Sequence, residues 1–147
     1  MIRQKLYIDR YDWLVYCFFA NTKQDAPSIM RLLDTIGIND EQYERASEHL
    51  HGGLKNSGMT YSHTNSHISV MVIGETTTPA ETLNTFSHEL RHLVDDISRT
   101  SNIESSGEEV AYLTGYIALA LASSLLYIAC QCPICSRHQC REQKQTP

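Results

Sequence analysis

Hydrophobic and polar positions repeat with two different periods along the chain, and each period predicts a kind of secondary structure. Residues 1–20 are rich in aromatic and β-branched side chains, which indicates one or two strands. Ile68, Val70 and Val72 recur at every second position, the pattern of a half-buried strand. We therefore predict a β-hairpin that joins 59–62 to 67–73 through a turn near 64–65.

Helical periodicity marks three further segments. Residues 25–36 place apolar side chains three and four apart and end at a glycine, and residues 41–51 follow Asn39 and end at two glycines. The third segment begins at Thr78, a good N-cap, with Pro79 at the first helical position. Its apolar stripe then predicts a long amphipathic helix, formed by Leu83, Phe86, Leu90, Leu93 and Ile97.

Residues 110–130 form a last helix that is apolar for about the length of a membrane span. Polar residues interrupt this run and two glutamates precede it, so we predict a central helix of a small soluble protein. A membrane-tethered protein is the alternative. Small residues recur along the helix and are predicted to face the preceding helix, at Ala111, Gly115, Ala118 and Ala122.

Composition limits the classes of function. The 147 residues suit a single domain over 1–130, followed by a Cys-rich polar tail over 131–147. A formal charge of −5 without a basic cluster argues against nucleic acid as a partner. Asp9 and Asp12 interrupt an N-terminal stretch that otherwise resembles a signal peptide. We therefore expect a cytoplasmic protein that uses no membrane.

Four residues of the tail have the spacing of a small metal knuckle, and the alternative is a reduced, unstructured end. These residues are Cys132, Cys135, His138 and Cys140.

Candidate chemistry centres on His88-Glu89-Leu90-Arg91-His92, which reads H-E-x-x-H. On a helix, His88 and His92 lie one turn apart on one face, where both imidazoles can bind one metal ion. Glu89 then lies beside that ion, where its carboxylate can take a proton from water. The alternative is that both histidines are solvated on the polar face of the helix.

A catalytic zinc site needs a third protein ligand, and two glutamates open the last helix. Ser105 or Ser106 is expected to cap this helix, which uses one glutamate at its third position. The stripe of small residues favours Glu108 as the metal ligand, and Glu109 is the alternative.

H-E-x-x-H, a short loop and then Glu108-Glu109-Val110-Ala111 resemble the gluzincin branch of the zincin metallopeptidases. The compact run from His88 to Tyr116 looks most like the small single-domain proteins of this type that phages and bacterial mobile elements carry, and the resemblance covers about residues 60–120. The resemblance implies an α+β, minimal zincin-like fold, in which a small antiparallel or mixed sheet accompanies a motif helix packed on a C-terminal apolar helix. It also implies Zn²⁺ held by His88, His92 and Glu108, with Glu89 as general base.

The predicted function is therefore a zinc-dependent metallopeptidase-like hydrolase that acts on a peptide or protein substrate. By the same resemblance, strand 67–73 forms the upper rim of the substrate cleft and pairs with an extended substrate. The alternative is a non-catalytic metal-binding or interaction protein that retains the scaffold. Asp95 or Asp96 are candidates to orient a ligand imidazole. The candidates for the group that donates a hydrogen bond to the oxyanion are Tyr112, Tyr116 and His63.

Overall fold

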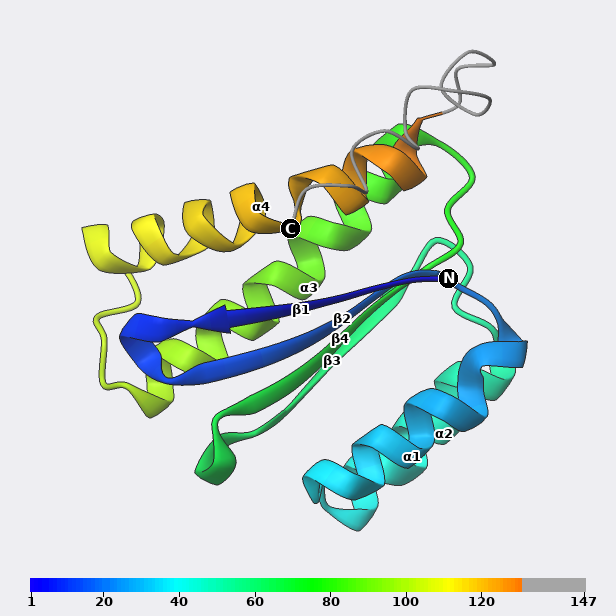
Figure 1. Cartoon of the computed structure of the whole chain (residues 1–147), viewed down its shortest axis with the longest axis horizontal. Helices are drawn as coiled ribbons and strands as arrows, with labels where there is room; N and C mark the ends of the chain where they lie inside the picture. Colours follow the sequence, from blue (N-terminus) through cyan, green and yellow to red (C-terminus); the bar gives the residue numbers. More distant parts are fainter. Residues whose placement is uncertain (131–147) are drawn as a thin grey trace.

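A computed structural model describes residues 1–130, so the predicted metal knuckle of the tail lies outside the described residues. Four strands form one mixed sheet with helices on both of its faces (Figure 1), and the α+β prediction is confirmed. The elements are β1 (Ile2–Ile8), η1 (Asp9–Tyr11), β2 (Trp13–Asn21), η2 (Lys23–Asp25), α1 (Ala26–Ile36), α2 (Asp40–Gly52), β3 (Gly58–His63), η3 (Thr64–Ser66), β4 (Ile68–Gly74), α3 (Pro79–Thr100) and α4 (Glu108–Ala129).

The strand order is β1-β2-β4-β3, and this order decides which strand can meet a ligand. β4 pairs parallel with β2 and antiparallel with β3. Both sides of β4 are thus hydrogen-bonded, and the expectation that residues 67–73 pair with an extended substrate is wrong. β3 is the edge strand on that side of the sheet, and it leaves one row of backbone groups unpaired by the sheet.

Each face of the sheet carries its own hydrophobic core. α1 and α2 cover one face, where residues such as Ile29, Leu33 and Leu50 pack against β3 and β4. α3 and α4 cover the other face, where Phe86, Leu93 and Ile117 belong to one cluster with Trp13 and Phe19. The alternation of side chains along the strands therefore serves two cores at once.

α3 begins as the sequence predicts. The Thr78 hydroxyl accepts a hydrogen bond from the Glu81 backbone N–H at 3.1 Å, and Pro79 is the first helical residue. Phe86, Leu90, Leu93 and Ile97 are buried, whereas Leu83 in the first turn is 59% exposed. The apolar stripe thus packs α3 against the sheet for most of its length. This packing determines the directions in which the side chains of the H-E-x-x-H residues point.

α4 differs from the prediction at its start and in its packing. The residue before the helix is Gly107, so neither serine caps it. Its buried side chains are Val110, Leu113, Ile117 and Leu121, while Ala111 and Gly115 are exposed. Ala118 and Ala122 are half-buried, and Ala118 packs against the margin of the core. The stripe of small residues therefore does not form the main packed face, because burying Val, Leu and Ile removes more apolar area from water.

α4 packs against α3 along the surface of the molecule, as predicted for the motif helix and the last helix, but it is not a central helix. Within residues 1–130 it is also the one helix long and apolar enough to cross a membrane.

Candidate metal and catalytic site

The two histidines of the motif converge on one point in space. His88 Nε2 and His92 Nε2 lie 3.1 Å apart, and their rings meet edge to face. Both side chains are exposed on α3. A tetrahedral metal with bonds of about 2.0–2.1 Å holds two nitrogens roughly 3.3–3.4 Å apart. The observed separation is slightly shorter than this, as expected for two imidazoles that share a hydrogen bond, and it is close to the spacing that one ion needs.

Glu89 points to a different side of α3, towards the edge strand. Its side chain is 3% exposed. The hydroxyl of Thr60 on β3 donates a hydrogen bond to Glu89 Oε2 at 2.8 Å. The carboxylate is therefore held in a buried position between the motif helix and β3, close enough to His88 and His92 for their charges to act on it.

Burial raises the pKa of Glu89 above its ordinary value, because a desolvated carboxylate favours its protonated form. The Thr60 hydrogen bond and the positive charges that His88, His92 and His49 can carry oppose this shift. A raised pKa gives Glu89 a stronger affinity for protons than an exposed glutamate has, which is the property of a general base.

This pKa makes the stability of the metal-free protein depend on pH. The folded protein binds a proton at Glu89 more tightly than the unfolded chain does. The free energy of unfolding therefore falls as the pH rises, between the pKa of Glu89 in the unfolded chain and its higher pKa in the folded protein. Glu89→Gln removes this ionisation. We expect the thermal stability of Glu89→Gln relative to wild type to increase from pH 4 to pH 8, measured by melting both with a chelator present. A difference that does not change with pH would contradict a raised pKa.

Gly58 provides the space that Glu89 occupies. A Cβ at position 58 would lie 2.6 Å from Glu89 Cγ and 2.6 Å from the Val72 carbonyl oxygen. We expect Gly58→Ala to displace Glu89 or separate β3 from β4, with a loss of about 1–3 kcal/mol in the free energy of unfolding. Denaturant titration measures this loss. Gly52→Ala is the matched control, since nothing lies within 4 Å of its added Cβ, and an equal loss in both variants would contradict the expectation.

The structure does not bring Glu108 to the histidine pair. Glu108 is exposed at the first residue of α4. α3 continues for eight residues beyond His92 before the loop that leads to α4, a length of about 12 Å along the helix. Among residues 1–130, no three His, Cys, Asp or Glu side chains are grouped so as to hold a metal ion.

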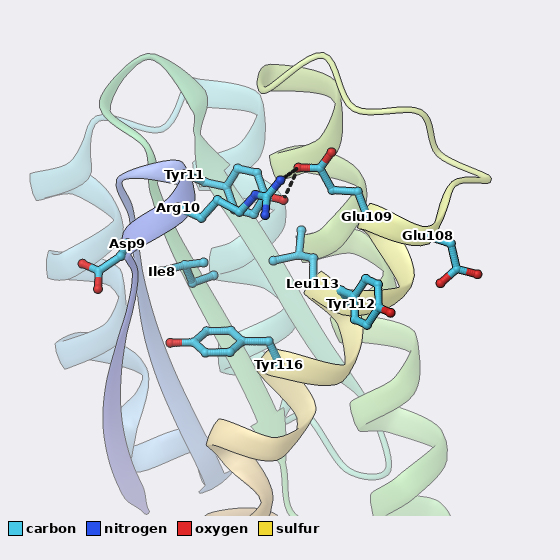
Figure 2. Close-up of a pocket in the computed structure, with 9 residues that line it drawn as sticks. All are labelled: Ile8, Asp9, Arg10, Tyr11, Glu108, Glu109, Tyr112, Leu113 and Tyr116. Atoms are coloured by element: carbon cyan, nitrogen blue, oxygen red, sulfur yellow. Dashed lines mark hydrogen bonds and ion pairs between the residues drawn. The ribbon is translucent and has the colours of Figure 1, made fainter.

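Glu109 is engaged elsewhere. Its Oε1 accepts a hydrogen bond from the Tyr11 hydroxyl at 2.9 Å and forms an ion pair with Arg10 Nη2 at 2.9 Å. These contacts tie the start of α4 to the η1 turn between β1 and β2 (Figure 2). The alternative third ligand is therefore also directed away from the two histidines.

The two tyrosines considered as oxyanion donors lie beside this same turn. Tyr112 and Tyr116 line a cavity of about 580 Å³ together with Tyr11, Leu113 and Glu109 (Figure 2). The cavity adjoins the β1 edge of the sheet, whereas Glu89 contacts β3 at the opposite edge. The two tyrosines thus belong to a different region from the motif.

The remaining candidates also have partners. His63 Nδ1 lies 2.7 Å from the Ser66 hydroxyl within the hairpin turn. Asp95 pairs with Arg91 at 2.9 Å and Asp96 with Arg99 at 3.1 Å, both within α3. Each aspartate is accordingly paired with an arginine of its own helix, and among the described residues neither aspartate accepts a hydrogen bond from a motif histidine.

Sequence reasoning missed the two β3 residues that hold Glu89, Thr60 and Gly58. Each stands in a short strand with no motif of its own, and the alternation of β3 alone could have placed both on the face towards α3. The chain matches no protein-family model, and comparisons with curated proteins and with solved structures likewise found no match.

Proposed function

We propose that the protein is a metal-dependent hydrolase of peptide bonds, with His88 and His92 as metal ligands and Glu89 as general base. The observation that carries this proposal is the 3.1 Å approach of the two Nε2 atoms beside a buried carboxylate. The convergence of two imidazole nitrogens is what a divalent ion such as Zn²⁺ needs, and a bound ion would supply a polarised, more acidic water.

The chain's own residues supply the proton chemistry. Glu89 takes a proton from water and returns it to the leaving amine, a task that suits a carboxylate with a raised pKa. Thr60 is a positioning residue, because its hydroxyl fixes one oxygen of Glu89 and leaves the other to accept the proton.

The edge strand supports a peptide as substrate. β3 ends the sheet, and Glu89 contacts it at Thr60. An extended peptide can add to such an edge through main-chain hydrogen bonds. These hydrogen bonds position the peptide backbone and do not depend on the identity of the peptide's side chains. A peptide bound along β3 would pass beside Glu89.

The side chains of the site provide two of the three protein ligands that a catalytic zinc ion needs. Two imidazoles are in place, whereas a third ligand is not gathered with them among residues 1–130. Glu108 stays a prediction, and as third ligand it requires the start of α4 to move towards His92 when metal binds. Zinc titration of Glu108→Ala tests this movement. A loss of zinc affinity of tenfold or more would support Glu108 as the third ligand. Unchanged zinc affinity would show that another residue supplies the third ligand.

The test of the function has two parts. Metal analysis of the purified full chain, followed by zinc titration, establishes whether the site is loaded. Cleavage of a mixed peptide library with added zinc, followed by mass spectrometry, then identifies cut bonds. Zinc binding without any cleavage would favour the second candidate, a non-catalytic metal-binding protein, which the exposed position of both histidines also permits.

Thr60→Val gives a sharper test of the base. Valine keeps the shape of the side chain but removes the donor that lowers the pKa of Glu89. We expect the acidic limb of the pH–rate profile to move to higher pH, while zinc affinity stays unchanged. Thr76→Val is the control, because Thr76 bonds to Thr82 rather than to Glu89. An unshifted profile in Thr60→Val would contradict the role given to Glu89.

A further inference from the structure

The outward face of α4 is apolar and has no cover within the described chain. Leu119 is 78% exposed, Tyr112 74% and Leu126 69%. Most soluble monomers do not expose a contiguous apolar patch of several hundred Å², and such patches mark interaction surfaces. We call this face the outer seam of α4, formed by Tyr112, Tyr116, Leu119, Ser123 and Leu126.

The spacing of the outer seam is that of a helix–helix contact. Its residues follow one another at intervals of four, three, four and three, which is the heptad pattern along which two helices pack. By helical periodicity Gly115 and Ala122 flank the seam. An added Cβ at Gly115 would meet nothing within 4 Å, so a partner helix can approach closely there.

The exposed area of the outer seam is more than half of what each partner contributes to a standard interface. With roughly 200 Å² for a fully exposed side chain of this size, the four large seam residues expose on the order of 500 Å². The smaller residues of the same face add to this. A standard interface buries about 800 Å² on each partner, so two copies of α4 would supply most of it.

Charge selects the direction of packing. α4 begins with Glu108 and Glu109, and no further charged residue follows until position 137. Parallel packing would bring the acidic starts of the two helices together, with Glu108 and Glu109 of one copy beside those of the other. Antiparallel packing keeps these like charges at opposite ends, and it also opposes the two helix dipoles favourably.

A membrane is a poorer match for the same face. Helices that lie on a bilayer surface carry Lys and Arg along their polar side, which attract anionic lipids. α4 has no basic residue, and its charged end is acidic. The neutral seam needs no such attraction when its partner is an identical neutral seam.

We propose that the protein forms a two-fold symmetric dimer through antiparallel packing of the outer seams of two α4 helices. Leu119 lies at the middle of α4, so each Leu119 meets its copy at the axis. Tyr112 and Leu126 lie seven residues to either side of Leu119 and therefore face each other. None of the seam residues belongs to the face that α4 buries against α3 and the sheet, so this dimer leaves the packing within each copy unchanged.

The first experiment measures oligomeric state. Analytical ultracentrifugation of the full chain at micromolar concentration is expected to give a dimer. Leu119→Glu places two like charges at the axis and is expected to give a folded monomer, with the fold checked by circular dichroism. Leu83→Glu is the control, because Leu83 is an exposed leucine on α3, and it should remain dimeric. A monomeric wild type or a dimeric Leu119→Glu would overturn the proposal.

The second experiment tests direction. The native cysteines after α4 are replaced by serine along with Cys130, and Cys17 is buried. Under oxidation, Leu119→Cys should form a disulfide with its own copy, whereas Tyr112→Cys and Leu126→Cys should link to each other but not to themselves. Self-linking at all three positions would overturn antiparallel packing. Sedimentation of a monomeric wild type with phosphatidylcholine–phosphatidylglycerol vesicles would assign the seam to a membrane instead.

Discussion

Glu89→Gln is expected to abolish cleavage of every peptide that the wild type cuts, while the protein stays folded and keeps its affinity for zinc. Glutamine has nearly the same shape, and its oxygen can still accept the hydrogen bond from Thr60. It cannot accept a proton at neutral pH, so the general-base contribution of about 10²–10⁴ in rate is lost. Steady-state cleavage of the identified peptide, at saturating zinc, measures the change in kcat.

The control separates the base from a general loss of negative charge. Glu44→Gln alters an exposed glutamate on α2, on the other face of the sheet. We expect its kcat to match that of wild type within twofold. A Glu89→Gln protein that retains a tenth or more of wild-type activity would remove Glu89 from the mechanism, even though its burial and its hydrogen bond would stand.

The elements were largely predictable because their signals are local. Thr78 and Pro79 define the start of α3 within one turn, and Gly37 ends α1 in the left-handed conformation at φ 79°. Asn39 caps α2 through the Gln42 backbone N–H. Each of these interactions joins residues within four positions of one another, so the sequence alone contains all the information they need.

The packing of α4 was not predictable in the same way. Small residues and large apolar residues both recur at helical spacing, on different faces of the same helix. The sequence does not show which face meets the sheet, because both faces lack charge from Val110 to Cys130. The structure buries Val110, Leu113, Ile117 and Leu121, and the argument that pointed Glu108 towards the histidines is thereby wrong.

The surroundings of Glu89 required the order of the strands. H-E-x-x-H identifies the three motif residues, and the convergence of His88 and His92 follows from helical geometry. The sequence does not say that β3 rather than β4 is the edge strand, since strand order depends on pairing between distant segments, such as Leu14 with Ile68, which are 54 residues apart. Thr60 and Gly58 enter the site only through that order.

Removing the histidines should have the largest effect on metal binding. His88→Ala or His92→Ala takes away one of two converging nitrogens, and the loss in zinc affinity should exceed the ~10–100-fold that removal of an outer hydrogen-bond partner costs. Wild type at a zinc concentration of 100 times its Kd should gain about 2.7 kcal/mol of stability. Each variant should gain almost none at that concentration, as measured by thermal melting with and without zinc.

The comparison depends on a histidine that is exposed but not part of the pair. His51→Ala on α2 serves this purpose, because its ring contacts the Ser47 carbonyl within its own helix, and it should keep the wild-type gain. The metal-free melting temperatures of all three variants should be similar, since His88 and His92 are exposed and contribute little packing. Zinc stabilisation that survives in the double variant His88→Ala/His92→Ala would place the metal away from the motif. The four candidate ligands of the tail would then be tested next, beginning with Cys132 and Cys135.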